Sequence, residues 1–559
     1  MPSVLSFPRA ALAVAVLTLS ACAVPSPRPD VEGASHAGDD ELTGTTSAER
    51  AIHFSGKVYV ADGSGDGEIA VAIAREVKTA IGALRMSKVS INDRAARSNL
   101  DPSRWSRRRV RVVDPAQPSV TQRSVVEVTF AYDDRAVVTN DLAKRSAIDF
   151  TVLADDYAQH ADVLKTSCTD DATTDTDSLW YHYQPQTSAC LAKIQEEIDA
   201  IAAERRTLGD LHDAVGPREA SRWFLPVTAK LDPAKIPGKA FSPEYDRLFG
   251  VGNDKSQLVV YAFFGVDKDE TNPDDLLAQE AAKFLRTMLR AQPNYRVVKT
   301  EPFAFLLDLY VDTDSGRKKL EGVTYDAMLG WIIDKSGYPA EVGSDATKMA
   351  ALRRQALEKL TERFIYWDVP LSVKDASGRE KTVTVEVRSF YGYEDGSQDA
   401  RQHAQWRYLE AFWYGDVFLY NGHSHFGHGP LEPTLYNPGN FNDRYQIMLV
   451  NSCISFNYYH QDFFEKKPGG TKNLDMIVNG LPSYVLDGGV ATARFLDGLV
   501  SGKQPTYPAL LESMRLDFSW GERGYDPMRV VDGELDNTFS QGSSSNGALT
   551  VTTLAPVYP

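Results

Sequence analysis

The sequence has only four cysteines among its 559 residues. Its formal net charge is −16 with both signs intermixed, and this argues against nucleic-acid binding, which needs clustered basic side chains. Beyond the amino terminus, no apolar run approaches the roughly 20 residues that span a bilayer. No internal repeat has a solenoid or propeller period. The chain is much longer than the roughly 300 residues at which single cores stop growing, so we expect two domains.

The amino terminus has the pattern of a secretory signal. Arg9 precedes a short apolar stretch, residues 10–19, that is too short to form a transmembrane helix. The ending Leu-Ser-Ala-Cys resembles the lipobox of bacterial lipoproteins, and this implies a signal peptide over 1–22 with Cys22 diacylated as the first mature residue. Ala23 stands where inner-membrane retention would need Asp, which favours the outer membrane. The alternative is an ordinary cleavable signal beside a chance cysteine.

The remaining chain divides by composition and periodicity. Residues 23–50 are rich in Pro, Ser, Gly, Thr and Asp and are expected to form a flexible tether. Residues 51–240 mix helical and strand patterns and predict a smaller α+β accessory domain. Residues 241–559 predict an α/β domain, in which strands over 382–391 and 416–420 flank a helix over 399–413. Such β-α-β units favour a mainly parallel sheet sandwiched by helices.

Three cysteines follow the predicted signal peptide. Cys168 and Cys190 flank a turn-rich stretch, and a bridge across a loop of that size is worth about 3 kcal/mol in the chain-entropy model. We therefore predict a disulfide between them. Cys453 is then the odd thiol, and two interpretations stay open: a reactive group, or a small apolar core residue.

Two short apolar runs each end on a residue that can do nucleophilic chemistry. Residues 416–420 lead into Asn-Gly-His423, and residues 446–450 lead into Asn-Ser-Cys453. Runs of this kind predict buried strands of a parallel sheet, and active sites of such sheets gather at the carboxyl ends of the strands. The histidine and the cysteine are therefore expected at one edge of the sheet. Thiol and imidazole together indicate a cysteine nucleophile with its base.

The two strand-ending motifs resemble the caspase-haemoglobinase fold of cysteine peptidases, and within it the gingipain and clostripain branches. The similarity covers roughly residues 250–520. It implies an endopeptidase acting on a peptide or protein substrate, with Cys453 as nucleophile, His423 as proton-transfer partner and the N–H groups of Ser424 and Cys453 as oxyanion donors. Ser424 stands where that group usually has Gly. His425 is the reserve base. This mechanism requires no metal or other cofactor. The lipid on Cys22 would be the only membrane anchor.

Two alternatives remain open. His423, His425 and His428 have the spacing of the His-x-His-x-Asp-His ligands of metallo-β-lactamases, which predicts a zinc-dependent hydrolase. Gly427 replaces the aspartate of that motif. The other alternative is a catalytically inactive caspase-like protein that only binds its partner. For a peptidase, Asp462 and Asp487 are candidates for an acidic specificity pocket.

Overall fold

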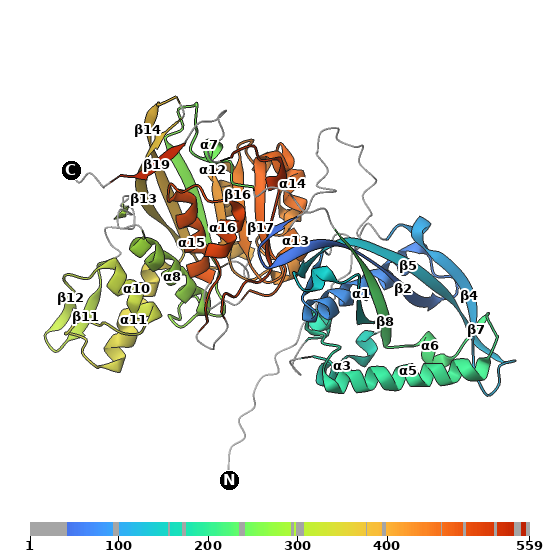
Figure 1. The fold of residues 1–559 in the computed structure, drawn as a ribbon. Coiled ribbons are helices and arrows are strands. Elements are labelled where there is room, and N and C mark those ends of the chain that lie inside the picture. The colour runs from blue at the N-terminus through green and yellow to red at the C-terminus, as the bar shows by residue number, and fades with distance from the viewer. Residues whose placement is uncertain are drawn as a thin grey trace, which may run out of the picture. The chain divides into compact units, whose positions relative to one another are not determined.

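The computed structural model describes residues 42–92, 100–154, 157–169, 175–233, 241–291, 296–297, 307–375, 377–393, 398–459, 461–483, 488–518, 523–540 and 549–554. Within these ranges the fold is mixed α/β, built on two large sheets and a small hairpin (Figure 1). The hairpin joins β11 (Tyr310–Thr313) and β12 (Gly316–Lys319). Calls on Cys22 and residues 1–41 lie outside the described ranges.

The larger sheet has ten described strands with a parallel centre. Its order is β1 (Thr43–Gly44), β18 (Arg529–Asp532), β17 (Leu474–Asn479), β16 (Gln446–Asn451), β15 (Val417–Asn421), β9 (Gln257–Phe264), β14 (Glu380–Tyr391), β13 (Arg363–Lys374) and β10 (Arg296–Val297), with β19 (Thr550–Thr553) also on β13. The strands from β17 to β14 are parallel, and the flanking pairs are antiparallel. The sheet that the sequence predicts to be mainly parallel is thus parallel only at its centre and antiparallel on both flanks.

Helices cover both faces of this sheet. Strand β9 shows why, because Leu258, Val260 and Ala262 belong to one hydrophobic cluster and the residues between them to another. One cluster is completed by α8 (Leu276–Ala291), α10 (Tyr325–Ile333), α11 (Ala346–Leu360), α15 (Gly488–Val500) and α16 (Tyr507–Ser513). The other is completed by α12 (Gln398–Tyr414), α13 (Phe456–Tyr459) and α14 (Asp462–Lys466). Strands that are buried on both faces have nearly continuous apolar sequences, as β9 does.

The predicted β-α-β unit is present, but its strands are not neighbours. Strands β14 and β15 both run parallel to β9, and β9 lies between them. The sequence predicts that these two strands are parallel, and both run parallel to β9. The structure places an earlier strand of the chain in the middle of the sheet.

The second sheet lies in the amino-terminal part of the described chain and is curled (Figure 1). Its order is β6 (Ala147–Leu153), β8 (Phe224–Pro233), β2 (Ser47–Ala61), β5 (Thr121–Thr139), β4 (Ser106–Val113) and β7 (Ala214–Val215), with β3 (Val89–Ile91) on β5. All of its pairs are antiparallel except β4 with β7. Its helices are α1 (Asp66–Met86), α3 (Ala161–Ser167), α4 (Leu179–His182), α5 (Ser188–Leu208) and α6 (Pro217–Ala220), and α7 (Tyr245–Leu248) follows it in the chain.

The predicted boundaries need two corrections. Strand β1 and the start of β2 fall inside the range expected to be a tether, so structured chain begins before residue 51. Strand β1 also pairs with β18 of the larger sheet, so the region before 240 contributes to both sheets. Residues 36–559 form one compact unit. Among the described helices, none is both long and apolar enough to span a bilayer.

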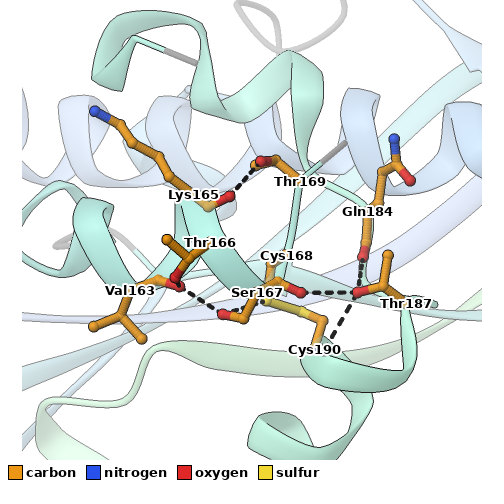
Figure 2. The surroundings of a disulfide bond; sticks show 9 residues. All are labelled: Val163, Lys165, Thr166, Ser167, Cys168, Thr169, Gln184, Thr187 and Cys190. Atoms are coloured by element: carbon orange, nitrogen blue, oxygen red, sulfur yellow. Dashed lines mark hydrogen bonds between the residues drawn. A yellow bond between two sulfur atoms is a disulfide. The ribbon is translucent and has the colours of Figure 1, made fainter. Parts of the chain in front are cut away.

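The predicted disulfide between Cys168 and Cys190 is confirmed (Figure 2). Cys168 follows α3, and Cys190 lies in the first turn of α5. Thr187 ties the two segments together, because its hydroxyl accepts from the Cys190 N–H at 3.3 Å and donates to the Ser167 carbonyl at 2.9 Å. Both sulfurs are buried in the core of the curled sheet.

Replacing both bridge cysteines by serine is expected to lower the free energy of unfolding by about 3 kcal/mol, because the loop they close spans 22 positions. Urea unfolding with and without dithiothreitol measures this. Reductant should shift the midpoint of the natural chain and leave that of the double variant unchanged. An equal shift in both would contradict the assignment.

Candidate active site at the carboxyl ends of the parallel strands

Strands β15 and β16 pair in parallel, as the sequence predicts, with Asn421 opposite Asn451. His423 and Cys453 each follow by two residues. Neighbouring strands lie about 4.8 Å apart, so the register brings the chain carrying the imidazole and the chain carrying the thiol out of the sheet at the same level. Both side chains are partly exposed. Their catalytic roles remain predictions.

A third strand end adds a carboxylate that the sequence reasoning missed. Asp267 follows β9, which pairs with the other side of β15, and its Oδ1 lies 3.3 Å from Nε2 of His423. The Asp267 side chain is 15% exposed, so water screens this contact only in part. Three adjacent parallel strands therefore supply Asp267, His423 and Cys453. The sequence offered one signal for Asp267: it lies three residues beyond the end of an apolar strand.

The thiol of Cys453 is free of disulfide bonding. It lies 3.6 Å from the Ser483 carbonyl, to which it donates. Burial raises the pKa of the Cys453 thiol, while the contacts with Ser483 and the positive charge of Arg85 act in the opposite direction. A thiol with a raised pKa is mainly protonated near neutral pH. It needs a neighbouring base to become a nucleophile.

The backbone beside both candidate residues is unusual. Ile454, directly after Cys453, has φ of 42°, and His425 and Phe426 have φ of 47° and 53°. Residues with a Cβ rarely adopt this left-handed backbone region, and β-branched residues such as isoleucine adopt it least of all. The surroundings impose these conformations: the Ile454 N–H donates to the Leu481 carbonyl at 3.1 Å. Such strain often marks functional sites.

The loop after β15 is held by two tyrosines. The Tyr420 hydroxyl donates to the His423 carbonyl at 2.7 Å, and the Tyr459 hydroxyl donates to the Ser424 carbonyl at 2.5 Å. Ser424 is 6% exposed. These bonds fix the peptide unit that carries the Ser424 N–H, which the sequence predicts as an oxyanion donor, and the peptide unit that follows it.

The three histidines of the zinc alternative do not gather. His423 and His425 have ring centroids 5.7 Å apart, while the side chain of His428 is 75% exposed and lies 3.7 Å from Glu432. Across the described ranges, no group of three or more His, Cys, Asp or Glu side chains is placed to hold a metal ion. The three rings therefore do not converge on one point, although their spacing in the sequence matches the motif, because the chain turns at residues 425–427.

Of the two acidic candidates for a specificity pocket, Asp462 lines a hollow of about 90 Å³ together with Phe426 and His428. Asp487 lies outside the described residues. The hollow lies beside the histidine loop.

Beneath the site runs a row of buried polar side chains. The register aligns Asn421, Asn451, Asn479 and Arg529 at the ends of four consecutive strands. The Asn451 amide donates to Asn421 at 2.9 Å and accepts from Asn479 at 3.0 Å and from Arg529 at 3.3 Å. Thr492, on α15, donates to Asn421 at 2.7 Å. All four members of the row are at most 4% exposed.

In comparisons with known proteins, no family model, curated protein or solved structure matches the chain.

Asn451→Leu is expected to lower the free energy of unfolding by about 2–4 kcal/mol, because it leaves buried polar groups of Asn479 and Arg529 without their partner. Urea unfolding measures this, with exposed Asn140→Leu as the control. If Asn451→Leu lowers the free energy of unfolding as little as the control does, the side chains of the row do not stabilise one another.

The raised thiol pKa predicts how Cys453 reacts with iodoacetamide. Only the thiolate reacts, so the rate should rise about tenfold per pH unit from pH 7 upward, because the raised pKa keeps most of the thiol protonated there. Mass spectrometry of the Cys453 peptide gives the rate at each pH. A rate that is already on a plateau at pH 7 would show a thiolate with a lowered pKa instead.

Proposed function

We propose that this chain is a cysteine endopeptidase in which Cys453 is the nucleophile, His423 its base and Asp267 the residue that orients the base. The observation that carries the proposal is the shared register: His423 and Cys453 follow an aligned Asn421–Asn451 pair by the same two residues. Asp267 from the adjoining strand end contacts the histidine. This arrangement agrees with the resemblance to the caspase-haemoglobinase fold.

The contact with Asp267 assigns a role to each ring nitrogen of His423. A carboxylate at Nε2 favours the tautomer with its proton on that atom. Nδ1 then carries the lone pair, and it is the atom that accepts the thiol proton. The carboxylate also stabilises the imidazolium that forms, as an orienting acid does in hydrolytic triads.

The reaction follows from these roles. His423 removes the proton of Cys453, and the sulfur attacks the carbonyl carbon of the scissile peptide bond. The N–H groups of Ser424 and Cys453 would stabilise the oxyanion, each for about 3 kcal/mol. The intermediate collapses, and His423 returns the proton to the leaving amine. Water, deprotonated by His423, then hydrolyses the thioester and restores the thiol.

The place of action is the cell envelope. The proposal rests on residues 1–22, whose ending resembles a lipobox with Cys22 as the acylated residue. A lipid at that position would hold the enzyme at a membrane surface, where envelope proteins and peptides are its substrates.

The proposal is tested with a pooled library of quenched fluorogenic peptides. Cys453→Ala and His423→Ala should each lower kcat/KM by about 100-fold or more, because both act in proton transfer and bond formation. Asp267→Asn should lower kcat by about tenfold, the worth of one charged hydrogen bond. His425→Ala is the matched control and should change little.

Three outcomes would overturn this assignment. Hydrolysis that survives in Cys453→Ala would remove the nucleophile. Hydrolysis that is abolished by 1,10-phenanthroline and restored by zinc would favour the metal-dependent alternative. A chain that hydrolyses nothing in the pool yet binds peptides would support the inactive relative.

A further inference from the structure

Strand β2 separates from its neighbour β8 after only four residue pairs. The paired residues are Arg50–His53 on β2 and Lys230–Pro233 on β8. Continuing that register places Pro226 opposite Lys57, since His53 pairs with Lys230 and the strands run antiparallel. Proline has no N–H to donate to a ladder. Strand β8 continues here along β6, which lies on its other side, and β2 keeps an edge that no described strand occupies beyond His53.

Side chains take the place of a strand at one point on this edge. The Lys57 N–H donates to the Glu76 carboxylate at 3.2 Å, and the Arg222 guanidinium donates to the Lys57 carbonyl. Gly56 makes room, because a Cβ there would lie 2.5 Å from the Glu76 oxygen. The Lys57 peptide groups therefore face away from β5. Since this direction alternates along an antiparallel strand, those of Tyr59 face the same way.

A cleft of about 400 Å³ opens along this edge, a volume within the range of ligand sites. Its lining includes Lys57, Tyr59, Arg123, His160 and Arg222. Glu76 is the one acidic residue of the lining and already accepts from the backbone.

The two arginines of the cleft supply its free positive charge. Lys57 is paired with Glu127 at 3.1 Å. Arg222 is 9% exposed and donates to a neutral carbonyl, and Arg123 donates to the Ser221 hydroxyl at 3.2 Å. Within the described ranges neither arginine forms an ion pair. Guanidinium groups are well suited to bind carboxylates.

We propose that this cleft binds a short extended peptide segment with acidic side chains. The segment adds to the open edge of β2, with its backbone paired at Tyr59 and an Asp or Glu carboxylate on Arg123 and Arg222. Main-chain bonds provide the affinity and the carboxylate the selectivity, as in other cases of strand addition. The site lies apart from Cys453 and does not depend on peptidase activity.

The probe is a fluorescein-labelled octapeptide amide of alternating threonine and glutamate, measured by anisotropy with the full chain. Two companion probes test the chemistry: one has lysine for glutamate, and the other has N-methyl groups on alternate backbone amides. The acidic probe should bind saturably, and each companion at least tenfold more weakly. Running the titration in Cys453→Ala as well separates this binding from cleavage, and the two proteins should agree.

Arg123→Glu should weaken the acidic probe at least tenfold, and this residue is exposed, so the fold should tolerate the change. Arg218→Glu is the matched control, because Arg218 is also exposed but does not line the cleft. No saturable binding, equal binding of the N-methylated probe, or equal weakening by both variants would overturn the proposal. Equal binding of the lysine probe would leave strand addition without acidic selectivity and would contradict the role of the arginines.

Discussion

The parallel register of β9, β15, β16 and β17 is the constraint on which the candidate site depends. Backbone pairing alone holds strands side by side, but the row of amides from Asn421 to Asn479 locks their ends at one level. A buried amide is costly without its partner. A slip of one residue would break every bond of the row, and it would also separate the level of His423 from that of Cys453.

The row lies where the sheet changes from parallel to antiparallel pairing. Arg529 joins it from β18, the first antiparallel strand beside the parallel centre, and its burial lowers the pKa of its guanidinium. Helix α15 contributes Thr492 from one face of the sheet. The same polar network therefore connects the parallel strands, the antiparallel strand β18 and a covering helix. It lies at the strand ends from which the two loops with positive-φ residues continue.

Much of this was visible in the sequence. The apolar runs before His423 and Cys453 predicted the two strands, and the turn-rich loop between Cys168 and Cys190 predicted the disulfide. The position of β9 was not visible, because pairing order depends on packing of the whole sheet and not on local pattern. Asp267 was missed for the same reason: it becomes a neighbour of His423 only once β9 lies beside β15. The histidine spacing did not reveal that a left-handed turn at residues 425–427 leads His428 away from His423 and His425.

In the amino-terminal sheet, part of one edge of β2 has no partner strand among the described residues. Pairing between β8 and β2 ends at Lys230 and His53, and Pro226, which has no N–H to donate, cannot resume the ladder farther along. Glu76 and Arg222 satisfy the exposed peptide groups of Lys57, which blunts the edge that the separation creates. The sequence reasoning assigned no chemistry to this region, because the arginines of the cleft come from separate segments of the chain.

The most direct test of the central claim is covalent labelling with a pool of peptidyl acyloxymethyl ketones, which react with a cysteine only when a catalytic site positions and activates it. The account predicts labelling at Cys453 that is lost in His423→Ala and kept in His425→Ala, as read by mass spectrometry. Labelling of Cys453 that does not depend on His423 would contradict it, and so would an unlabelled Cys453 in a folded chain.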